Sequence, residues 1–486
     1  MYYKLAPITH VLSRLGFVFS LLLLAPTLVS YLYQDAAFWV FADTAAATIC
    51  ASGIIWLVTR SHQRELRTRD GFTLVFLLWV GFAVVASLPF YWYLPGISYT
   101  DAFFEAISGL TTTGATVFTN LDSFPPSLNF WRHLLNWVGG MGIIVLAVAI
   151  LPMIGVGGTQ LFKAEIPGIH KDSKLAPRIS QTAKNLWLIY VFFTLITCLA
   201  LRLAGMSWLD AVCHAMSCIG LGGFSTHDQN IAYFDSVPIE MILSVGSIIA
   251  AISFTNHYYA FRQRSLNAYR RDSEVRVMIT TLIASIIACA LYLWHKDFYP
   301  DWSHALRFVG FNFISIGLAN GYANTDFAAW PLPVSLWMFF LANILSNAGS
   351  AGGGLKTIRA IVLFKFSLRE MMLLLHPNAV HTVKINGMHI AERTAMTVLV
   401  FTAVYFLTII FATFALMATG LDFVTALTAA TACITNAGPG LGSVGPAGSY
   451  ANLADIQKWL CTIVMLLGRL EIFTVFMLFT PAYWRK

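Results

Sequence analysis

Charged residues are scarce in this sequence. Asp, Glu, Lys and Arg make up 11% of its 486 residues, against 58% hydrophobic residues. That leaves too little polar surface to keep several soluble domains of this total length in water. The formal net charge is +7, but no basic run is interleaved with aromatic residues, which argues against a nucleic-acid partner. The composition predicts an all-α polytopic membrane protein surrounded by lipid.

Residue patterns typical of disulfides, metal centres and catalysis are missing from the sequence. The seven cysteines are an odd number without a CxxC pair, and we interpret them as small buried side chains. The twelve histidines include no HExxH motif. Residues 349–357 approach a Walker A motif, but Leu355 separates Gly354 from Lys356 and no strand precedes them. We therefore expect neither enzymatic activity nor an organic cofactor.

Apolar segments of the length that a membrane crossing needs, about 20 residues, recur along the whole chain. There are about ten, near 15–33, 36–58, 71–94, 128–154, 185–205, 234–260, 276–295, 332–356, 395–419 and 457–482. The first follows Lys4 and Arg14, as in a secretory signal. Because a second apolar segment follows at once, we interpret residues 1–69 as an uncleaved transmembrane hairpin.

Four shorter apolar segments alternate with the later spans, and each leads into a glycine. A ten-residue helix rises only about 15 Å, so these segments are predicted to be half-helices that enter the membrane and return. The segments are 101–110, 210–219, 303–318 and 421–434, and the glycines are Gly114, Gly222, Gly321 and Gly438. The pattern of span, half-helix and span (M1-P-M2) predicts four pore repeats in a pseudo-fourfold arrangement, at 70–184, 185–275, 276–393 and 394–486.

The positions of lysine and arginine predict one orientation for all four repeats. None occurs between Arg69 and Arg132, between Arg202 and Arg262, between Arg307 and Lys356, or between Arg393 and Lys458, and each of these gaps contains one of the four glycines. By the positive-inside rule, the half-helices then enter from outside, and the basic clusters and both termini are cytoplasmic. The clusters are Arg60, Arg64, Arg67 and Arg69; Lys163, Lys171, Lys174, Arg178 and Lys184; Arg262, Arg264, Arg270, Arg271 and Arg276; and Lys356, Arg359, Lys365, Arg369, Lys384 and Arg393.

Glycine loops at membrane depth suit a neutral cation filter. Non-helical backbone is tolerated there only where protein or water satisfies its amide groups, and a pore supplies water. Glycine lets carbonyl groups turn inward to replace the hydration shell of an ion, and no loop carries an acidic residue at its glycine. Turns between packed helices are the alternative for any single loop. Four loops in register favour a pore for a monovalent cation.

Six aspartates flank the half-helices. Asp101, Asp210 and Asp422 stand near helix starts, where a carboxylate caps free amides. Asp122, Asp228 and Asp326 follow the loops on the predicted external side. There they either concentrate cations at the mouth or are ordinary solvated turn residues.

Two features predict a gate beneath the filter. The span after the third loop runs into a glycine-rich stretch that cannot remain helical at about 1 kcal/mol per glycine; its candidate gate residues are Asn347, Gly349, Ser350, Gly352, Gly353 and Gly354. In the last span Arg469 lies among apolar residues, where an unpaired guanidinium costs roughly 2.5–3.5 kcal/mol. We expect Glu471 to point away from it. We hypothesise that carbonyl groups of the glycine-rich stretch, or Ser350, hold Arg469 as a barrier; a structural ion pair is the alternative.

With these motifs, the chain resembles the Trk/Ktr/HKT superfamily of potassium transporters over essentially its whole length, and most closely the bacterial Trk branch, to which the N-terminal hairpin also points. The motifs that carry the resemblance are 110–117, 222–227, 352–354, 438–442 and 468–473. The resemblance implies a bacterial inner-membrane protein that transports K⁺, forms a homodimer and docks a cytosolic nucleotide-binding ring of the TrkA type. It also implies filter residues: Thr112, Thr113 and Gly114; Gly220, Leu221 and Gly222; Ala319, Asn320 and Gly321; and Asn436, Ala437 and Gly438.

Glycine in all four loops resembles the potassium-selective members, although the third loop reads Ala319-Asn320-Gly321-Tyr322 instead of Thr-Ala-Gly-Phe. The prediction is K⁺ uptake through the filter, gated by the glycine-rich loop and Arg469. The alternative is a secondary symporter that couples K⁺ to H⁺ or Na⁺. Inverted repeats would favour that class, whereas these repeats all face the same way. An intramembrane enzyme ranks third, since no nucleophile or metal pair is present.

Overall fold

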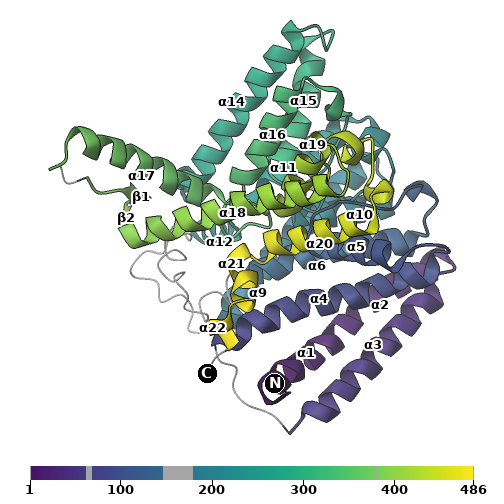
Figure 1. Cartoon of the computed structure of the whole chain (residues 1–486). Helices are drawn as coiled ribbons and strands as arrows, with labels where there is room; N and C mark the ends of the chain where they lie inside the picture. The colour runs from purple at the N-terminus through teal and green to yellow at the C-terminus, as the bar shows by residue number, and fades with distance from the viewer. Residues whose placement is uncertain (1, 62–67, 146–178, 379–380, 485–486) are drawn as a thin grey trace.

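The computed structural model describes residues 2–61, 68–145, 179–378 and 381–484, which form a bundle of helices (Figure 1). In these ranges the only strands are the antiparallel pair β1 (Lys384–Ile385) and β2 (Met388–His389). The predicted all-α fold is confirmed. The basic residues Arg64, Arg67, Lys163, Lys171, Lys174 and Arg178 and the end of the predicted span 128–154 lie outside the described residues.

The chain begins with a helical hairpin. Helices α1 (Tyr2–Leu22) and α2 (Leu24–Tyr33) together supply one apolar span, and α3 (Phe38–Thr59) supplies the next. A Cβ on Gly16 of α1 would collide with the Ser52 hydroxyl of α3, so this glycine permits the close approach of the two helices. Asp35, in the turn of the hairpin, accepts a hydrogen bond from the amide of Ser127 (3.0 Å). The hairpin is thereby attached to the first repeat.

Four groups of helices follow, and each begins with a long helix of at least 23 residues. The first contains α4 (Thr68–Tyr93), α5 (Tyr99–Leu110) and α6 (Pro126–Val145); the second contains α9 (Ile179–Leu203), α10 (Trp208–Gly220), α11 (Val237–Ala251) and α12 (Phe254–Gln263). The third contains α14 (Ser273–His295), α15 (Trp302–Gly317), α16 (Leu332–Ile344) and α17 (Thr357–Leu375); the fourth contains α18 (Glu392–Ala418), α19 (Phe423–Thr435), α20 (Asp455–Arg469) and α21 (Ile472–Leu478). Short helices and 3-10 turns complete the described part: η1 (Leu121–Ser123), η3 (Asn230–Phe234), α13 (Asn267–Arg270), η4 (Phe327–Ala329), η5 (Gly442–Val444), η6 (Tyr450–Asn452) and α22 (Pro481–Trp484).

The short helices α5, α10, α15 and α19 coincide with the four predicted half-helices. Ser98 and Ser207 are the N-caps of α5 and α10, and each hydroxyl accepts the amide of an aspartate three residues later and donates to its carboxylate. Asp422 itself caps α19. The prediction of a capping carboxylate is therefore correct for Asp422 and wrong for Asp101 and Asp210, since those two lie inside the first helical turn behind a capping serine.

Three of the predicted spans are broken. Helices α11 and α12 meet at 94°, and α20 and α21 meet at 111°. In the third repeat, α16 ends at Ile344 and the chain is non-helical until Thr357, as predicted for the glycine-rich stretch. The predicted spans 234–260 and 457–482 therefore each consist of two helices that meet at a sharp bend. Glu471, at the second bend, has φ 57°, a backbone conformation that no α-helix accommodates.

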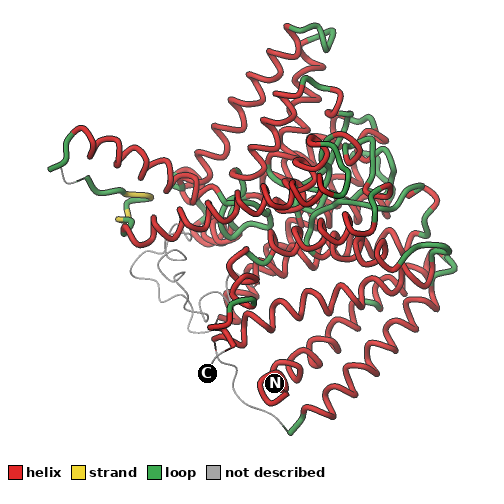
Figure 2. The backbone as a smooth tube through the Cα atoms, viewed as in Figure 1, coloured by secondary structure: helices red, strands yellow, loops and turns green. Residues whose placement is uncertain are grey.

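The breaks change the count of membrane crossings. Among the described residues, six helices are long and apolar enough to cross a membrane, or up to eight if each bent pair is one span. The other two of the roughly ten predicted spans are α6, which carries Asn129, Arg132, His133 and Asn136, and α16, which has only 13 residues. Figure 2 shows that many of the loops around these helices lie together in one part of the molecule.

Candidate functional site

All four half-helices end in the same backbone turn. One or two residues after the end of each half-helix, a residue has positive φ. The amide of the residue that follows it donates to the carbonyl five residues earlier, as in a Schellman motif. The residues with positive φ are Thr112 (54°), Leu221 (51°), Ala319 (58°) and Asn436 (55°). The amides that donate to the carbonyl five residues back belong to Thr113 (2.8 Å), Gly222 (2.8 Å), Asn320 (2.7 Å) and Ala437 (2.9 Å).

A glycine with positive φ follows each turn, and the second loop differs here from the sequence prediction. The glycines are Gly114 (77°), Gly223 (64°), Gly321 (101°) and Gly438 (84°). Gly223, one residue later than the predicted Gly222, is therefore the equivalent of the other three, and Gly220 is the last residue of α10. The sequence has Gly222 and Gly223 in succession, so composition alone does not determine which one occupies the turn.

These four glycines place the loops around a common axis. A Cβ built on any of them would lie under 3.0 Å from a carbonyl oxygen of the neighbouring loop. The pairs are Gly114 with Gly222, Gly223 with Asn320, Gly321 with Ala437, and Gly438 with Thr113. Loop one thus contacts loop two, two contacts three, three contacts four, and four returns to one. Only a closed ring of four loops satisfies this order.

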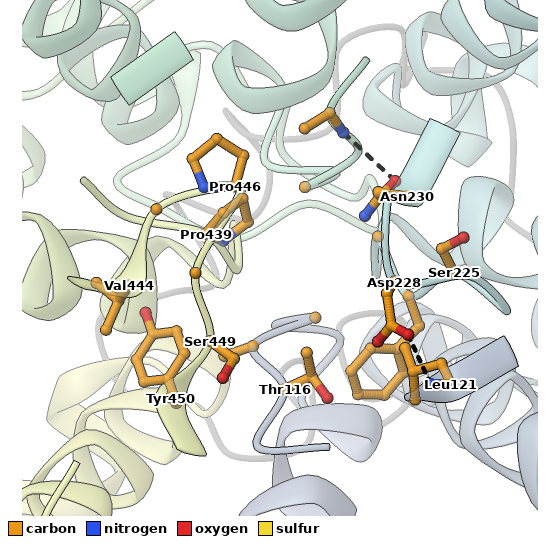
Figure 3. A pocket seen from close by; sticks show the side chains of 18 of the residues that line it. Thr116, Leu121, Ser225, Asp228, Asn230, Pro439, Val444, Pro446, Ser449 and Tyr450 are labelled. Atoms are coloured by element: carbon orange, nitrogen blue, oxygen red, sulfur yellow. Dashed lines mark hydrogen bonds between the residues drawn. The ribbon is translucent and has the colours of Figure 1, made fainter. Parts of the chain in front are cut away.

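A pocket lies directly beside the ring, and Figure 3 shows loop segments of all four repeats surrounding it. Its lining includes three of the ring glycines together with Pro439, which follows the fourth. Thr116, Asp228 and Ser449 are among the polar residues that reach it. Because the sequence places these residues after the ring glycines, on the predicted external side, we interpret the pocket as the outer mouth.

Several oxygen atoms at the ring have no protein partner. The side-chain oxygens Thr112 Oγ1, Asn320 Oδ1 and Asn436 Oδ1 are buried and accept no hydrogen bond among the described residues. Buried polar atoms in native proteins normally have a partner. These oxygens and the neighbouring carbonyls are neutral, so they are available to water or to a desolvated monovalent cation. His214, in contrast, bonds to the Asp210 carbonyl and Ser225 hydroxyl and is a packed residue.

A buried ion pair braces the first two loops. Arg132 Nε on α6 donates to Glu105 Oε1 on α5 (2.8 Å), and both side chains are at most 1% exposed. Arg132 Nη1 also donates to the carbonyl of Ser225 (3.0 Å), two residues after Gly223, while Glu105 accepts the amide of Val117 (3.0 Å). The sequence prediction missed this pair. The available signal was one charge of each sign in consecutive membrane segments, Glu105 in α5 and Arg132 in α6.

We expect Glu105→Ala to lower the free energy of unfolding by about 3–5 kcal/mol, because it leaves the Arg132 guanidinium buried without its carboxylate. Thermal unfolding of the purified protein in detergent measures the effect. The double variant Glu105→Met with Arg132→Met is the control, since removal of both charges is expected to cost less than removal of one. A double variant less stable than the single variant would contradict this account.

Charged groups also join the first two loops beside this pocket. His227 Nδ1 contacts Asp122 Oδ1, His227 Nε2 lies 3.5 Å from Asp210 Oδ1, and the ring stacks on Tyr233. Asp228 accepts the amide of Leu121 (3.0 Å). Asp122 and Asp228 therefore link loops, whereas Asp326 caps the short turn η4. Of the two predicted roles, the ordinary turn residue fits Asp326.

The stability contributed by His227 is expected to depend on pH. Burial alone would lower the pKa of His227, but its contacts with Asp210 and Asp122 raise it above 6.5. Burial opposes the lowering of the Asp122 pKa, yet the bond to His227 keeps that pKa below 3.8. Both partners of the contact are thus charged between pH 3.8 and 6.5. Its contribution to stability is lost at higher pH, where His227 loses its proton, and at lower pH, where Asp122 gains one.

Wild type is therefore expected to melt at a higher temperature than His227→Gln. This difference in melting temperature is expected to be largest between pH 3.8 and 6.5 and to become smaller at more alkaline pH. His304→Gln provides the matched control, because His304 pairs with Asp301 on the exposed surface, where ion pairs contribute little. Equal pH profiles for the two variants would contradict the expectation.

Beneath the ring lies the non-helical segment 345–356, which we name the gate segment. A Cβ on Gly353 would overlap the carbonyl of Thr435, and one on Gly352 would lie 3.3 Å from Leu221 Cδ1. The segment thus contacts the turns of two filter loops. Glycine at both positions permits this approach.

Arg469 on α20 also holds the gate segment. Its Nη1 donates to the carbonyl of Ala351 and its Nη2 to the carbonyl of Gly139 on α6, both at 2.8 Å, and the side chain is 2% exposed. Carbonyl groups therefore hold the guanidinium, as hypothesised, and Ser350 does not, since its hydroxyl donates to Asn347. Glu471 pairs with Arg359 instead (3.1 Å).

Comparison with known proteins identifies close relatives. The family model TrkH, described as "Cation transport protein", matches residues 38–486. The "Trk system potassium uptake protein TrkH" of Halomonas elongata is 44% identical over 486 residues, covering 99% of this chain and 100% of that protein. "Trk system potassium uptake protein TrkG" of Escherichia coli is 36% identical, with 99% and 98% covered. The solved structure "Crystal Structure of the Potassium Transporter TrkH from Vibrio parahaemolyticus" superposes with a TM-score of 0.91 at 40% identity, over 99% of this chain and 100% of that one.

Proposed function

The chain belongs to the TrkH family of cation transport proteins, and from this membership we propose that it takes up K⁺ across a bacterial inner membrane through the ring around Gly114, Gly223, Gly321 and Gly438. It is a transporter and not an enzyme, and K⁺ is its substrate. Relatives along the whole chain are named as potassium uptake proteins.

The closed ring of loops is the observation that carries this proposal. Carbonyl groups converging from four sides replace the hydration shell of a K⁺ ion. The proposed ligands precede the ring glycines; they are Thr112, Thr113, Leu221, Gly222, Ala319, Asn320, Asn436 and Ala437. The C-terminal end of each half-helix points toward the ring, and its partial negative charge favours a cation by about 0.3–1 kcal/mol.

The gate segment and Arg469 are proposed to close the pathway below the filter. The segment contacts the turns at Leu221 and Thr435, so an ion leaving the filter meets it at once. The Arg469 guanidinium adds a positive charge next to it, and a fixed cation opposes the passage of K⁺. Conduction then requires the segment and Arg469 to move apart.

Two partners are proposed with the channel. Four exposed arginines lie between the last turn of α12 and the start of α14. We propose that they offer a basic surface to a cytosolic nucleotide-binding ring of the TrkA type; they are Arg262, Arg264, Arg270 and Arg271. A homodimer is proposed because α17, which extends from the body of the molecule (Figure 1), exposes apolar side chains including Phe364 (66%) and Leu375 (72%). Larger apolar surfaces of this kind mark protein or membrane contacts.

Ion flux in proteoliposomes tests the function. We expect uptake of K⁺ and Rb⁺ to exceed that of Na⁺ and Li⁺ in vesicles containing the purified protein. K⁺ flux is then measured with and without an imposed H⁺ or Na⁺ gradient. Uptake of K⁺ against its own gradient when another gradient is imposed would show the symport alternative. Flux of K⁺ only down its own gradient would show a channel. Equal flux of all four ions would overturn the proposed filter.

A further inference from the structure

The gate segment is held from several directions, because it is non-helical backbone enclosed by the protein. Besides Arg469, the break between α11 and α12 supplies two contacts. The amide of Asn347 donates to the carbonyl of Ala251 (3.2 Å), and the amide of Phe254 donates to the carbonyl of Gly349 (3.1 Å). These bonds hold the first half of the segment. At its return into α17, the amides of Leu355 and Thr357 donate to the carbonyls of Asn343 (2.7 Å) and Ser346 (2.9 Å).

Glu274 supplies a side-chain contact at that return, and it comes from a different helix, α14. It lies in the first turn of α14 and is 0% exposed. Its Oε1 accepts the amide of Ala348 (3.0 Å), inside the gate segment, and the amide of Ile358 (3.1 Å), in the first turn of α17. A single carboxylate oxygen therefore joins the gate segment to the helix that follows it. A carboxylate at the N-terminus of α17 is also favoured by the helix dipole.

The backbone between these two amides is in an unfavourable conformation. Lys356, which is not glycine, has φ 77°, and such residues persist only where surrounding contacts hold them. Glu274 contacts the chain on both sides of Lys356, so it holds the segment in the bent path that lies under the filter.

Glu274 is itself positioned by cytoplasmic elements. Asp272 caps α14 and accepts the amide of Glu274 (2.8 Å), and its other oxygen accepts a hydrogen bond from Asn256 on α12. The amide of Ser273 donates to Asn386 Oδ1 (3.0 Å), in the turn between β1 and β2. Movement of α12 or of this hairpin would therefore displace Glu274.

We propose that Glu274 is a positioning residue that holds the gate segment in its closed place beneath the filter and connects it to α12 and the β1–β2 hairpin. The inference rests on the proposed function, since it assigns the control of a gate to a contact outside the ion pathway. Glu274 touches no transported ion; it acts through Ala348 and Ile358.

Flux through full-length protein in proteoliposomes tests the proposal. We expect Glu274→Ala to raise K⁺ flux about tenfold, equivalent to about 1.4 kcal/mol, with the preference for K⁺ over Na⁺ unchanged, because the filter is intact. Glu274→Gln keeps an oxygen that accepts both amides and is expected to restore most of the closed state. The matched control is Glu240→Ala, because Glu240 is a buried carboxylate of α11 that pairs with Arg307 and does not contact the gate segment.

Glu274→Asp provides a second variant if Glu274→Ala does not fold. Its side chain retains the charge but is too short to reach both amides. Its K⁺ flux is expected to be higher than that of wild type and lower than that of Glu274→Ala. Wild-type flux in Glu274→Ala or Glu274→Asp, or an equal rise in Glu240→Ala, would overturn the role of Glu274. Wild-type protein without any preference for K⁺ would overturn the proposed function itself, which keeps the two failures distinct.

Discussion

Replacement of Gly114 by alanine is expected to abolish selective K⁺ transport. Gly114 has φ 77°, and a Cβ there would lie under 3.0 Å from the carbonyl oxygen of Gly222 in the next loop. A side chain in this backbone region costs of order 1–3 kcal/mol, and the overlap with backbone is relieved only if the second loop moves. Displaced carbonyl groups no longer match a desolvated K⁺ ion. A loss of about 2.7 kcal/mol in ion binding corresponds to roughly a 100-fold loss of K⁺ flux.

Flux assays with K⁺ and Na⁺ measure this effect, and Gly81→Ala is the matched control. Gly81 lies in α4, and a Cβ on it would meet no atom of another element within 4 Å. This variant is expected to keep wild-type flux, because alanine favours a helix by about 1 kcal/mol over glycine. A Gly114→Ala protein that folds and retains the wild-type ratio of K⁺ to Na⁺ flux would show that the ring does not select the ion.

Neutralisation of Arg469 is expected to raise K⁺ flux by at least about tenfold. The variant loses the two charge-assisted bonds to Ala351 and Gly139, and this loss lowers the stability of the closed state by more than about 1.4 kcal/mol. Arg469→Gln also removes the fixed positive charge beneath the filter. Single-channel recording or vesicle flux shows whether the open fraction rises. The preference for K⁺ is expected to remain, because Arg469 makes no hydrogen bond to the filter loops within the described residues.

Arg202→Gln is a suitable control for this experiment. Arg202 also donates to a backbone carbonyl, that of Met206 (2.9 Å), but lies at the end of α9 away from the gate segment. We expect it to leave flux unchanged. Unaltered flux in a well-folded Arg469→Gln protein would remove the arginine from the gate, and the gate segment alone would then have to close the pathway.

The sequence was informative wherever a feature depends on neighbours along the chain. Short apolar segments before Gly114, Gly321 and Gly438 predicted the half-helices, since their length is set by composition and by the glycine turn. The unwinding of 345–356 was likewise predictable, because several glycines in succession cannot sustain a helix.

Features that depend on contacts between repeats were not predictable in the same way. Gly222 and Gly223 are both glycine, so the sequence does not distinguish them. The positive φ of Gly223 (64°) and the hydrogen bond from the Gly222 amide to the Ser217 carbonyl show which one follows the turn. The bends at Ser253 and Glu471 are not marked by proline or by a glycine run. The first is held by a bond from the Phe254 amide to Gly349 of the gate segment, and the second by the pair of Glu471 with Arg359 on α17. Glu105 and Arg132 are 27 residues apart, and no local pattern pairs them.

The cyclic order of the loops also has a consequence for biosynthesis. The last contact of the cycle joins the fourth loop to the first, where Asn436 Nδ2 donates to Thr113 Oγ1 across 323 residues of chain. A ribosome delivers the first loop long before the fourth, so a nascent chain holds an incomplete circle until its final quarter has been inserted.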